Sequence, residues 1–379
     1  MKYFLIAGEA SGDLHASSLM KQLIRQDPSA EFRFMGGDLM DKVSPGLVMH
    51  YRETSYMLLD VLFHLRKIFR NMRKIKAEVT RWNPDVVIPV DYPGFNMRIA
   101  RFASSRGFRV YYYISPKVWA WKQKRVEQLR KFTRKLFVIL PFEVAYFRQF
   151  NMAVEYFGNP LVDGVTRFME RFIGGDAWKR SQGLDQRPLV ALLAGSRNKE
   201  IQGTLPVMVR IAAQHPDYQF VVAGAPSIDP ALYTSYLEGT GVGVVYGETY
   251  GLLASATAGM VTSGTATLEA ALFKVPQVVI YRTSPLAYAI GKLIVKINFI
   301  SLVNLILDRG LVKEVLQKRL YEASKQELSR ILNQREARER IMEGYHEIEK
   351  MLGDPGVSER IAKRMVELIN EENEACENC

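Results

Sequence analysis

The chain has 379 residues, enough for two domains of ordinary size that each bury their own core. Hydrophobic residues at 48% and charged residues at 24% are typical of globular proteins and exclude a disordered or fibrous chain. The 51 Lys and Arg against 40 Asp and Glu give a formal net charge of +11, which favours an anionic partner. Both cysteines, Cys376 and Cys379, lie near the C-terminus, which indicates a reducing, cytoplasmic compartment rather than a disulfide framework.

Short apolar runs alternate with longer amphipathic stretches, a pattern typical of βα units and parallel sheets. In the first half, strands are expected at residues 3–7, 32–35, 86–90, 110–114 and 136–140. In the second half, they are expected at residues 189–193, 220–223, 242–246, 260–262 and 277–281. From residue 312 onward the sequence is charged and helical, without a strand signal.

These two series predict an α/β protein with two Rossmann-like domains that face a central cleft, followed by a helical C-terminal segment. The expected domains are residues 1–165 and 166–345, with a C-terminal helix and acidic tail at 346–379. The first apolar run is interpreted as a strand rather than a signal peptide. The longest apolar stretch contains Lys292 and Lys296, so no membrane span is predicted.

Positive charge is concentrated in two stretches of the first half. Residues 61–77 contain six basic and no acidic residues, and residues 117–135 contain eight basic residues beside Glu127. Nucleic acid, anionic lipid and a phosphorylated substrate are all compatible with such stretches.

Ligands of parallel sheets bind at the carboxyl ends of the strands, so the residues that follow each predicted strand are the candidates for chemistry. After residues 260–262, small and hydroxyl side chains allow a diphosphate to approach a helix N-terminus. This loop comprises Ser263, Gly264, Thr265, Ala266 and Thr267. Glu269, about one turn further, is suited to accept hydrogen bonds from a ribose diol. The alternative is an ordinary helix start with an acidic first turn.

A second loop of the same half, Gly195-Ser196-Arg197, follows the run at 189–193. Arg197 keeps its charge at any working pH and can bind a phosphate bidentately, or it pairs with Glu200 on the helix surface. Ser196 and Tyr281 are further candidates for substrate binding. The five histidines are scattered and no Asp-x-Asp pair is present, so no metal site is predicted.

In the first half, Asp91 ends the apolar run at 86–90, where an acidic group is placed to take a proton from a hydroxyl nucleophile. The alternative is a carboxylate that stabilises the turn or caps the next helix. Glu9 and Ser11, on the loop after the first strand, are candidate catalytic residues, and Gly12 is a candidate for substrate contact. Ser11 is alternatively a helix N-cap.

Seven segments, in chain order, together resemble one family. They are AGEASGDLHASSL, VDYPGFN, YYYISPKVWAWKQKRV, LPFE, LLAGSR, TSGTATLEAAL and SLVNLILDRGLVKEVLQ. The series resembles the lipid-A-disaccharide synthases, inverting glycosyltransferases of the two-Rossmann GT-B architecture, from residue 2 to about residue 317. The resemblance implies transfer from UDP-2,3-diacylglucosamine to 2,3-diacylglucosamine 1-phosphate, which releases UDP and forms a β-1,6-linked disaccharide for lipid A.

The resemblance also implies residue roles. Asp91 would be the general base toward the acceptor 6-hydroxyl, and UDP would be held by Arg197, the 263–267 loop, Glu269, Asn304 and Gln317. No metal or organic cofactor is implied. A homodimer is compatible with the resemblance.

Acyl chains need an apolar landing site, and one overlaps the basic stretch at 61–77. Its residues are Met57, Leu58, Leu59, Val61, Leu62, Leu65, Ile68 and Phe69. They predict an enzyme that associates peripherally with the anionic inner membrane from the cytoplasmic side. The alternative is a core helix with a solvated cationic face.

Two other functions fit parts of the sequence. A sugar-nucleotide 2-epimerase of the same architecture would act on a soluble sugar, and residues 57–69 disfavour it. A nucleic-acid-binding protein would use the basic stretches with Trp119, Trp121 and Phe132 as stacking surfaces. Nucleic acid is not the expected partner, since the glycine-rich loops would then have no role.

Overall fold

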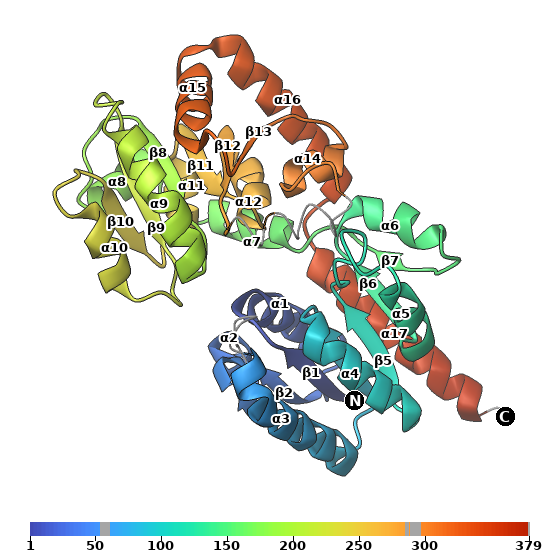
Figure 1. The fold of residues 1–379 in the computed structure, drawn as a ribbon. Coiled ribbons are helices and arrows are strands. Elements are labelled where there is room, and N and C mark those ends of the chain that lie inside the picture. The colour runs from blue at the N-terminus through green and yellow to red at the C-terminus, as the bar shows by residue number, and fades with distance from the viewer. Residues whose placement is uncertain (54–60, 285–287, 289–296, 378–379) are drawn as a thin grey trace. The chain divides into compact units, whose positions relative to one another are not determined.

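A computed structural model describes residues 1–53, 61–284, 288 and 297–377, with the backbone alone at 61–65 and 376–377. The chain forms two compact units. The first comprises Met1–Pro160 and Gly353–Cys379, and the second comprises Leu161–Leu352. Both units are parallel α/β structures (Figure 1).

The first unit contains a seven-stranded parallel sheet in the order β3-β2-β1-β4-β5-β6-β7. Its strands are β1 (Lys2–Ala7), β2 (Glu31–Gly36), β3 (Leu47–His50), β4 (Val86–Val90), β5 (Arg109–Tyr113), β6 (Lys135–Val138) and β7 (Glu155–Tyr156). The chain builds outward from β1 to β3 and then returns to place β4 beside β1. The point between β1 and β4 is therefore the topological switch point, where α/β sheets bind ligands.

Both faces of this sheet are covered by helices. They are α1 (Ala10–Gln26), α2 (Asp38–Asp41), α3 (Val61–Trp82), α4 (Pro93–Ser105), α5 (Arg125–Phe132), α6 (Pro141–Arg148) and α17 (Val357–Glu377), with the 3₁₀ turn η1 (Tyr51–Glu53). Alternate residues of β1 enter different cores: Leu5 packs with residues of α1 and α17, and Ile6 packs with residues of α3 and α4. Burial on both faces explains the continuous apolar runs of these strands.

The C-terminal helix belongs to the first unit and not to a separate segment. In α17, Ile361, Met365 and Ile369 are buried and pack against α1 (Figure 1). The Glu372 carboxylate lies 3.0 Å from the Arg109 guanidinium of β5. The expected C-terminal helix therefore spans Val357–Glu377, with its apolar residues buried up to Ile369 and its acidic residues from 371 to 375 exposed or half-buried.

The second unit repeats the same wiring in a six-stranded parallel sheet of order β10-β9-β8-β11-β12-β13, with its switch point between β8 and β11. Its strands are β8 (Leu189–Leu193), β9 (Gln219–Gly224), β10 (Gly243–Tyr246), β11 (Ala258–Thr262), β12 (Gln277–Tyr281) and β13 (Lys313–Leu316). Its helices are α7 (Leu161–Met169), α8 (Gly175–Ser181), α9 (Asn198–Ala212), α10 (Pro230–Leu237), α11 (Thr249–Ser255), α12 (Ala266–Leu272), α14 (Leu302–Leu307), α15 (Leu320–Asn333) and α16 (Arg335–Leu352).

All ten expected strands are present, and three further strands were missed. The absence of a strand after residue 312 was a wrong expectation, since β13 pairs with β12 at the edge of the sheet. Its exposed Lys313 and half-buried Glu314 conceal the apolar pattern. The chain passes from the first unit to the second after Pro160 and returns to the first after Leu352, where the sequence suggested boundaries at 165 and 345. None of the helices within the described residues is long and apolar enough to cross a bilayer.

Candidate active site

Two predicted loops of the first unit meet at its switch point. Ala7 ends β1 opposite Val90 of β4, so the loop that carries Glu9 lies beside Asp91. The two carboxylates are close enough that the charge of Glu9 raises the pKa of Asp91. The fold thus brings together two residues that are 82 positions apart in the sequence.

The backbone at Asp91 is held in a rarely used conformation. Asp91 and Tyr92 have φ of 44° and 45°, two consecutive left-handed residues with side chains. Such residues cost on the order of 1–3 kcal/mol each and persist only where neighbours hold them. The Asp91 carbonyl accepts hydrogen bonds from Asn96 Nδ2 at 2.8 Å and from the Tyr112 hydroxyl at 2.7 Å. The Asp91 N–H donates to the Tyr113 carbonyl at 3.0 Å.

Glycine is required at position 8 for this arrangement. A Cβ on Gly8 would overlap the ring of Tyr92, which lies across the end of β1. The aromatic ring and the glycine therefore pack the two switch-point loops together. Tyr92 in turn begins α4, as its N-cap residue.

The Asp91 carboxyl is suited to proton transfer near neutral pH. Burial raises the pKa of Asp91 to about 6, while the Lys117 ammonium and the Tyr92 N–H oppose this rise. The group is therefore ionised at pH 7 and more basic than an ordinary aspartate. A carboxylate of this kind is suited to act as a general base.

A small pocket opens beside Asp91. It has a volume of about 130 Å³ and is lined by Asp91, Pro93, Pro116, Lys117, Val118, Trp121 and Arg125. Most of these residues come from the loop between β5 and α5, within the segment SPKVWAW. The sequence placed Lys117 in a basic stretch and Trp121 among possible stacking surfaces, but it did not predict that they line a pocket with Asp91.

The Glu143 carboxylate anchors the loop between β5 and α5 by a hydrogen bond. It accepts hydrogen bonds from the indole N–H of Trp119 at 3.2 Å and from the N–H groups of Ile139 and Leu140. Burial raises the pKa of Glu143 to about 7. The segment LPFE contained the signal for this residue, since a buried glutamate three residues after a helix N-cap satisfies the free N–H groups there.

Glu9 and Ser11 are both exposed on the loop and first turn of α1. The N-cap of α1 is Glu9, whose side chain makes no capping hydrogen bond, so the alternative of Ser11 as N-cap is wrong. Gly12 is buried, and a Cβ there would lie 3.3 Å from that of Ala7. Gly12 therefore serves helix–strand packing.

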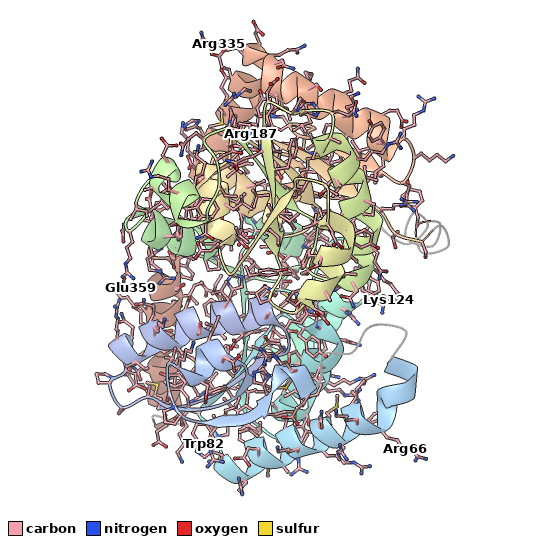
Figure 2. The ribbon with its side chains drawn as sticks, turned by 90° about the vertical axis from the view of Figure 1, so that its left-hand side faces the viewer. Arg66, Trp82, Lys124, Arg187, Arg335 and Glu359 are labelled. Atoms are coloured by element: carbon pink, nitrogen blue, oxygen red, sulfur yellow. The ribbon has the colours of Figure 1, made fainter. Side chains whose placement is uncertain are left out.

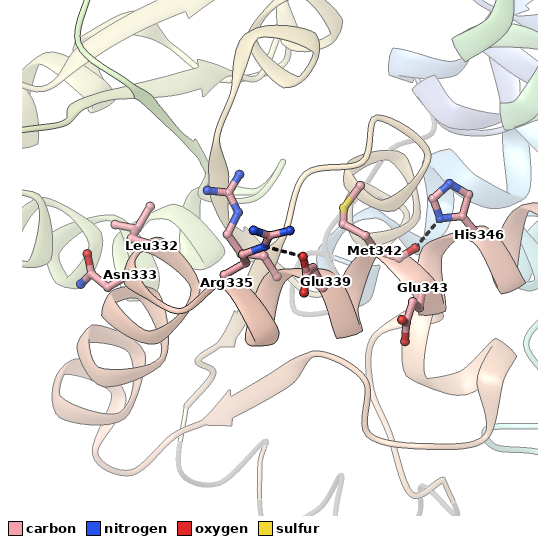
Figure 3. Close-up of a pocket in the computed structure, with 8 residues that line it drawn as sticks. Leu332, Asn333, Arg335, Glu339, Met342, Glu343 and His346 are labelled. Atoms are coloured by element: carbon pink, nitrogen blue, oxygen red, sulfur yellow. Dashed lines mark hydrogen bonds and ion pairs between the residues drawn. The ribbon is translucent and has the colours of Figure 1, made fainter.

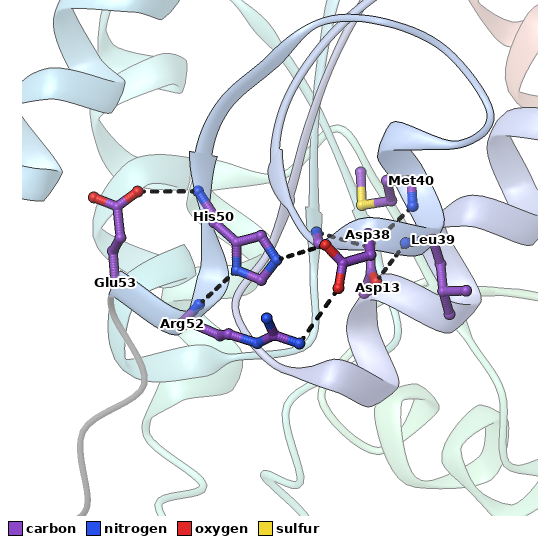
Figure 4. A network of polar contacts seen from close by, with 8 residues as sticks. Asp13, Asp38, Leu39, Met40, His50, Arg52 and Glu53 are labelled. Carbon is purple, nitrogen blue, oxygen red and sulfur yellow. Dashed lines mark hydrogen bonds and ion pairs between the residues drawn. The ribbon is translucent and has the colours of Figure 1, made fainter. Parts of the chain in front are cut away.

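Other polar residues of the same motif are structural. The Asp13 carboxylate accepts hydrogen bonds from the N–H groups of Gly37, Leu39 and Met40 and so caps α2 (Figure 4). Nearby, Asp38 accepts from His50 and Arg52, both at 3.3 Å. These contacts fasten the β2–α2 loop to the end of β3.

In the second unit, Arg197 lies at the switch point beside the end of β8. It pairs with Glu200 at 2.9 Å, the alternative considered from the sequence, yet 58% of its side chain is exposed. The other Glu200 oxygen accepts the Ser196 N–H at 3.1 Å. Gly195 has φ of 114°, and a Cβ there would lie 2.7 Å from Glu200. Glu200 thus shapes this loop and orients the guanidinium.

The loop after β11 has one exposed part and one anchored part. Ser263 donates to the Ile300 carbonyl at 2.8 Å, and the buried Thr267 hydroxyl donates to the Gly264 carbonyl at 2.8 Å. Gly264 has φ of 151° and nothing within 4 Å of its Cβ position. Thr265 is exposed and Ala266 is half-buried, so the backbone of the loop from Gly264 to Ala266 is accessible to a ligand.

Glu269 and Tyr281 are partly buried near these loops. The Tyr250 hydroxyl donates to Glu269 at 3.1 Å, and burial raises the pKa of Glu269. Burial also raises the pKa of Tyr281, and the charges of Glu200 and Arg197 both act on its hydroxyl. The structure therefore places Tyr281 near Arg197.

The side-chain amides of Asn304 and Gln317 are bonded to neighbouring groups of the chain. The buried Asn304 amide donates to the Val312 carbonyl and Glu314, and its oxygen accepts from the N–H groups of Leu311 and Val312. The Gln317 amide pairs with both backbone groups of Thr283. Each side chain therefore holds a loop in place, and its contact with UDP stays a prediction.

The predicted apolar landing site is described only in part. Met57, Leu58 and Leu59, and the side chains of Val61, Leu62 and Leu65, lie outside the described residues. Ile68 is half-buried, and Phe69 is 50% exposed with the Arg98 guanidinium 6.0 Å from its ring. The cationic residues around them are exposed, and Arg66 points away from α3 (Figure 2).

A larger hollow of about 600 Å³ lies along α15 and α16, away from the strand ends. Figure 3 shows its lining, in which Arg335 pairs with Glu339 at 2.6 Å and His346 contacts the Met342 carbonyl at 2.7 Å. These two contacts are both between residues four positions apart on α16. The hollow adds nothing to the switch-point loops.

Two Rossmann-like units with ligand loops at their switch points define an α/β protein of the GT-B class. Solved structures share this fold at low identity. UDP-GlcNAc 2-epimerase from Neisseria meningitidis, bound to UDP-GlcNAc, has a TM-score of 0.72 and 12% identity, and covers 97% of this chain and 100% of that one. The calicheamicin glycosyltransferase CalG4 has a TM-score of 0.59 and 16% identity, over 97% and 98%. These likenesses show the fold alone.

The chain belongs to the lipid-A-disaccharide synthetase family, whose model matches residues 3–363. The lipid-A-disaccharide synthase of Myxococcus xanthus is 36% identical over 383 residues, 97% of each chain. That of Geobacter metallireducens is 34% identical over 377 residues, again 97% of each. The protein is therefore a glycosyltransferase that uses a UDP-sugar and an acceptor, and the predicted fold class and family are confirmed. The epimerases share the fold at 12% identity, whereas the relatives at 34% and 36% identity are synthases, which favours the transferase.

Proposed function

We propose that this protein transfers the sugar of UDP-2,3-diacylglucosamine to the 6-hydroxyl of 2,3-diacylglucosamine 1-phosphate. The products are UDP and the β-1,6-linked disaccharide 1-phosphate of lipid A. One observation in particular carries this proposal: a carboxylate of raised pKa, Asp91, lies beside a pocket at the switch point of a chain from this family.

In this proposal Asp91 takes the proton of the acceptor 6-hydroxyl. A sugar hydroxyl is nearly as weak an acid as water, whose pKa is about 15.7, so a base is needed as the new bond forms. The acceptor oxygen attacks the anomeric carbon, the bond from that carbon to UDP breaks, and UDP leaves with the electron pair. Attack opposite the leaving group inverts the anomeric carbon and produces the β-linkage.

On the donor side we assign the diphosphate to Arg197 and the 263–267 loop. An exposed guanidinium and accessible backbone N–H groups are suited to stabilise the negative charge that develops on the leaving group. Ser196 and Tyr281 border Arg197, and Glu269 is placed to accept hydrogen bonds from the ribose diol. Asn304 and Gln317 act indirectly, because they hold the loops after α14 and β13.

We also propose that the enzyme associates with the anionic surface of the inner membrane from the cytoplasmic side. Half-exposed Phe69, beside exposed cations of α3, supports this location. Nucleic acid is not part of the proposal, since lipid and phosphate account for both basic stretches. A homodimer stays a prediction, which analytical ultracentrifugation checks.

The proposed reaction is tested by mass spectrometry and UDP release with the purified protein. The donor and the 1-phosphate acceptor together should yield one disaccharide 1-phosphate and one UDP per turnover. Neither sugar alone should release UDP at a comparable rate. Conversion of the UDP-sugar to its 2-epimer without acceptor would instead support the epimerase alternative.

A further inference from the structure

The pocket beside Asp91 contains an excess of positive charge. Lys117 and Arg125 line it together with Asp91. Among the described residues, no carboxylate lies within 4.0 Å of Lys117, Lys122 or Arg125, whereas Arg109, Arg130, Arg134 and Arg364 of the same unit have such partners. Arg125 is half-buried at the start of α5, so its charge lies in the wall of the pocket rather than on open surface.

These cations are also close to one another. Lys122 Nζ lies 4.2 Å from the centre of the Trp121 ring, and the Arg125 guanidinium carbon lies 5.7 Å from it. Burial, together with the charge of Arg125, lowers the pKa of Lys122. Lys117 and Arg125 beside the single carboxylate of Asp91 leave one positive charge unbalanced in the pocket, and an unbalanced positive charge attracts an anionic ligand group.

We propose that the pocket bounded by Asp91, Lys117 and Arg125 binds the phosphate monoester of the acceptor sugar. This inference rests on the proposed function and names the residues that recognise one group of its acceptor. Arg125 forms charge-assisted hydrogen bonds to the phosphate, and Lys117 contributes a second charge between the phosphate and Asp91.

The size of the pocket favours a small group over a whole ligand. At about 130 Å³ it is well below the roughly 300–1,000 Å³ of sites that enclose drug-sized molecules. It has room for a phosphate and not for an acyl chain. The sugar ring would then lie outside, near Trp121, whose side chain is 39% exposed.

The chemistry of a hexosamine 1-phosphate fits the short separation of base and cations. C1 carries the phosphate and C5 carries the 6-hydroxymethyl group, and both carbons are bonded to the ring oxygen. The nucleophilic hydroxyl and the phosphate therefore both lie at the edge of the ring that contains the ring oxygen. A single sugar can present one to Asp91 and the other to Arg125.

Two substitutions test this subsite, with a matched control from the same segment. Lys117→Gln and Arg125→Gln should each raise the KM for the acceptor by about 10- to 100-fold, the usual effect of losing a charge-assisted hydrogen bond. The KM for the UDP-sugar should change less than about twofold. Lys124→Gln removes an equal charge that does not line the pocket, and it should leave the acceptor KM nearly unchanged. Melting temperatures establish that all three variants are folded.

An acceptor without its phosphate distinguishes direct recognition from a general electrostatic effect. Removal of the phosphate should raise the acceptor KM of the wild type strongly and that of Arg125→Gln only slightly, because both changes delete the same interaction. An equal increase in acceptor KM in the two proteins would overturn the proposal. So would an increase in acceptor KM in Lys124→Gln as large as that in Arg125→Gln.

A binding measurement separates this proposal from the overall reaction. Glucosamine 1-phosphate, which has no acyl chains, should bind the wild type and not Arg125→Gln, with glucosamine as the control ligand. Binding that depends on Arg125 in a protein that releases no UDP would keep the subsite and count against the proposed reaction alone. If glucosamine 1-phosphate does not bind, and phosphatidylglycerol vesicles bind only when Arg125 is present, the cations face lipid headgroups and the proposal is wrong.

Discussion

The indole N–H of Trp119 donates to the carboxylate of Glu143 across 3.2 Å, and both groups are buried. This bond joins the loop that lines the Asp91 pocket to the N-terminus of α6. It connects two sequence segments, SPKVWAW and LPFE, that have no evident relationship in the linear chain.

Trp119→Phe should loosen this loop. The buried carboxylate would lose one of its three donors, which costs about 1–3 kcal/mol of unfolding free energy. Urea denaturation measures this loss, and acceptor KM should rise because the pocket is less well ordered. Trp121→Phe, at an exposed position of the same loop, is the stability control. A variant at position 119 with unchanged stability would show that Glu143 finds another donor.

Asp91→Asn should remove the base while keeping its shape. Turnover is expected to fall by about 10²–10⁴-fold, the range typical of general base catalysis. UDP affinity, measured by calorimetry, should remain near that of the wild type, since Asp91 and Arg197 lie in different units. Near-normal turnover would return Asp91 to the role of a turn residue.

The pH dependence of kcat/KM provides an independent test of Asp91. A base must be ionised, and the Asp91 carboxyl loses its proton above a pKa of about 6. The rate should therefore rise with pH and level off, with a midpoint near pH 6. The residual activity of Asp91→Asn should lack this limb. A limb that persists in the variant would belong to another group, and Glu143, with a pKa of about 7, is the first to examine.

Arg197→Ala should weaken both UDP binding and turnover by roughly tenfold or more, because it removes a charge-assisted contact to the leaving group. Stability should change by less than about 1 kcal/mol, as for other exposed ion pairs. Lys199→Ala removes a neighbouring exposed charge at the start of the same helix, and it should weaken neither UDP binding nor turnover. If both variants lost UDP affinity equally, long-range charge and not a direct contact would explain the effect.

Gly8→Ala should be far more disruptive than its size suggests. The added methyl group would overlap the Tyr92 ring, so the ring must move and carry Asp91 with it. We expect a loss of about 1–3 kcal/mol in stability, as for overpacked cores, together with a large loss of turnover. Gly94→Ala, three residues after Asp91, meets nothing within 4 Å and should be folded and active. Enzyme assays and thermal melts of Gly8→Ala and Gly94→Ala test this prediction.

Much of the fold followed from sequence because buried parallel strands are continuous apolar runs. The strands β4, β8 and β12 have the predicted bounds, and each is almost wholly buried. Of the four edge strands, β10 was predicted and β3, β7 and β13 were missed. The three missed strands have only two to four residues, and β7 and β13 each contain charged side chains, so none of them forms a recognisable apolar run.

The site was predictable in position and less so in detail. The structure places Asp91, Arg197 and Ser263 on loops that follow strands, as the apolar runs indicated, and the roles of these residues stay predictions. The engagement of Asn304 and Gln317 with nearby backbone was not predictable, since it depends on loop paths that residue type does not reveal. The capping role of Glu143 has a signal in LPFE, whereas its hydrogen bond with Trp119 depends on two loops that meet only in the folded chain.

The discontinuous first unit affects the order in which the two units fold during synthesis. The first unit is built from residues near both ends of the chain, with α17 supplying Ile361, Met365 and Ile369 to the core beneath β1. During synthesis this core stays incomplete until the second unit has already emerged, so the second unit is able to fold before the first does. An N-terminal fragment that stops at residue 160 would expose the apolar faces of α1 and β1. A circular permutant with residues 353–377 placed ahead of Met1 would make the first unit a continuous stretch of chain, and its folding independent of the rest.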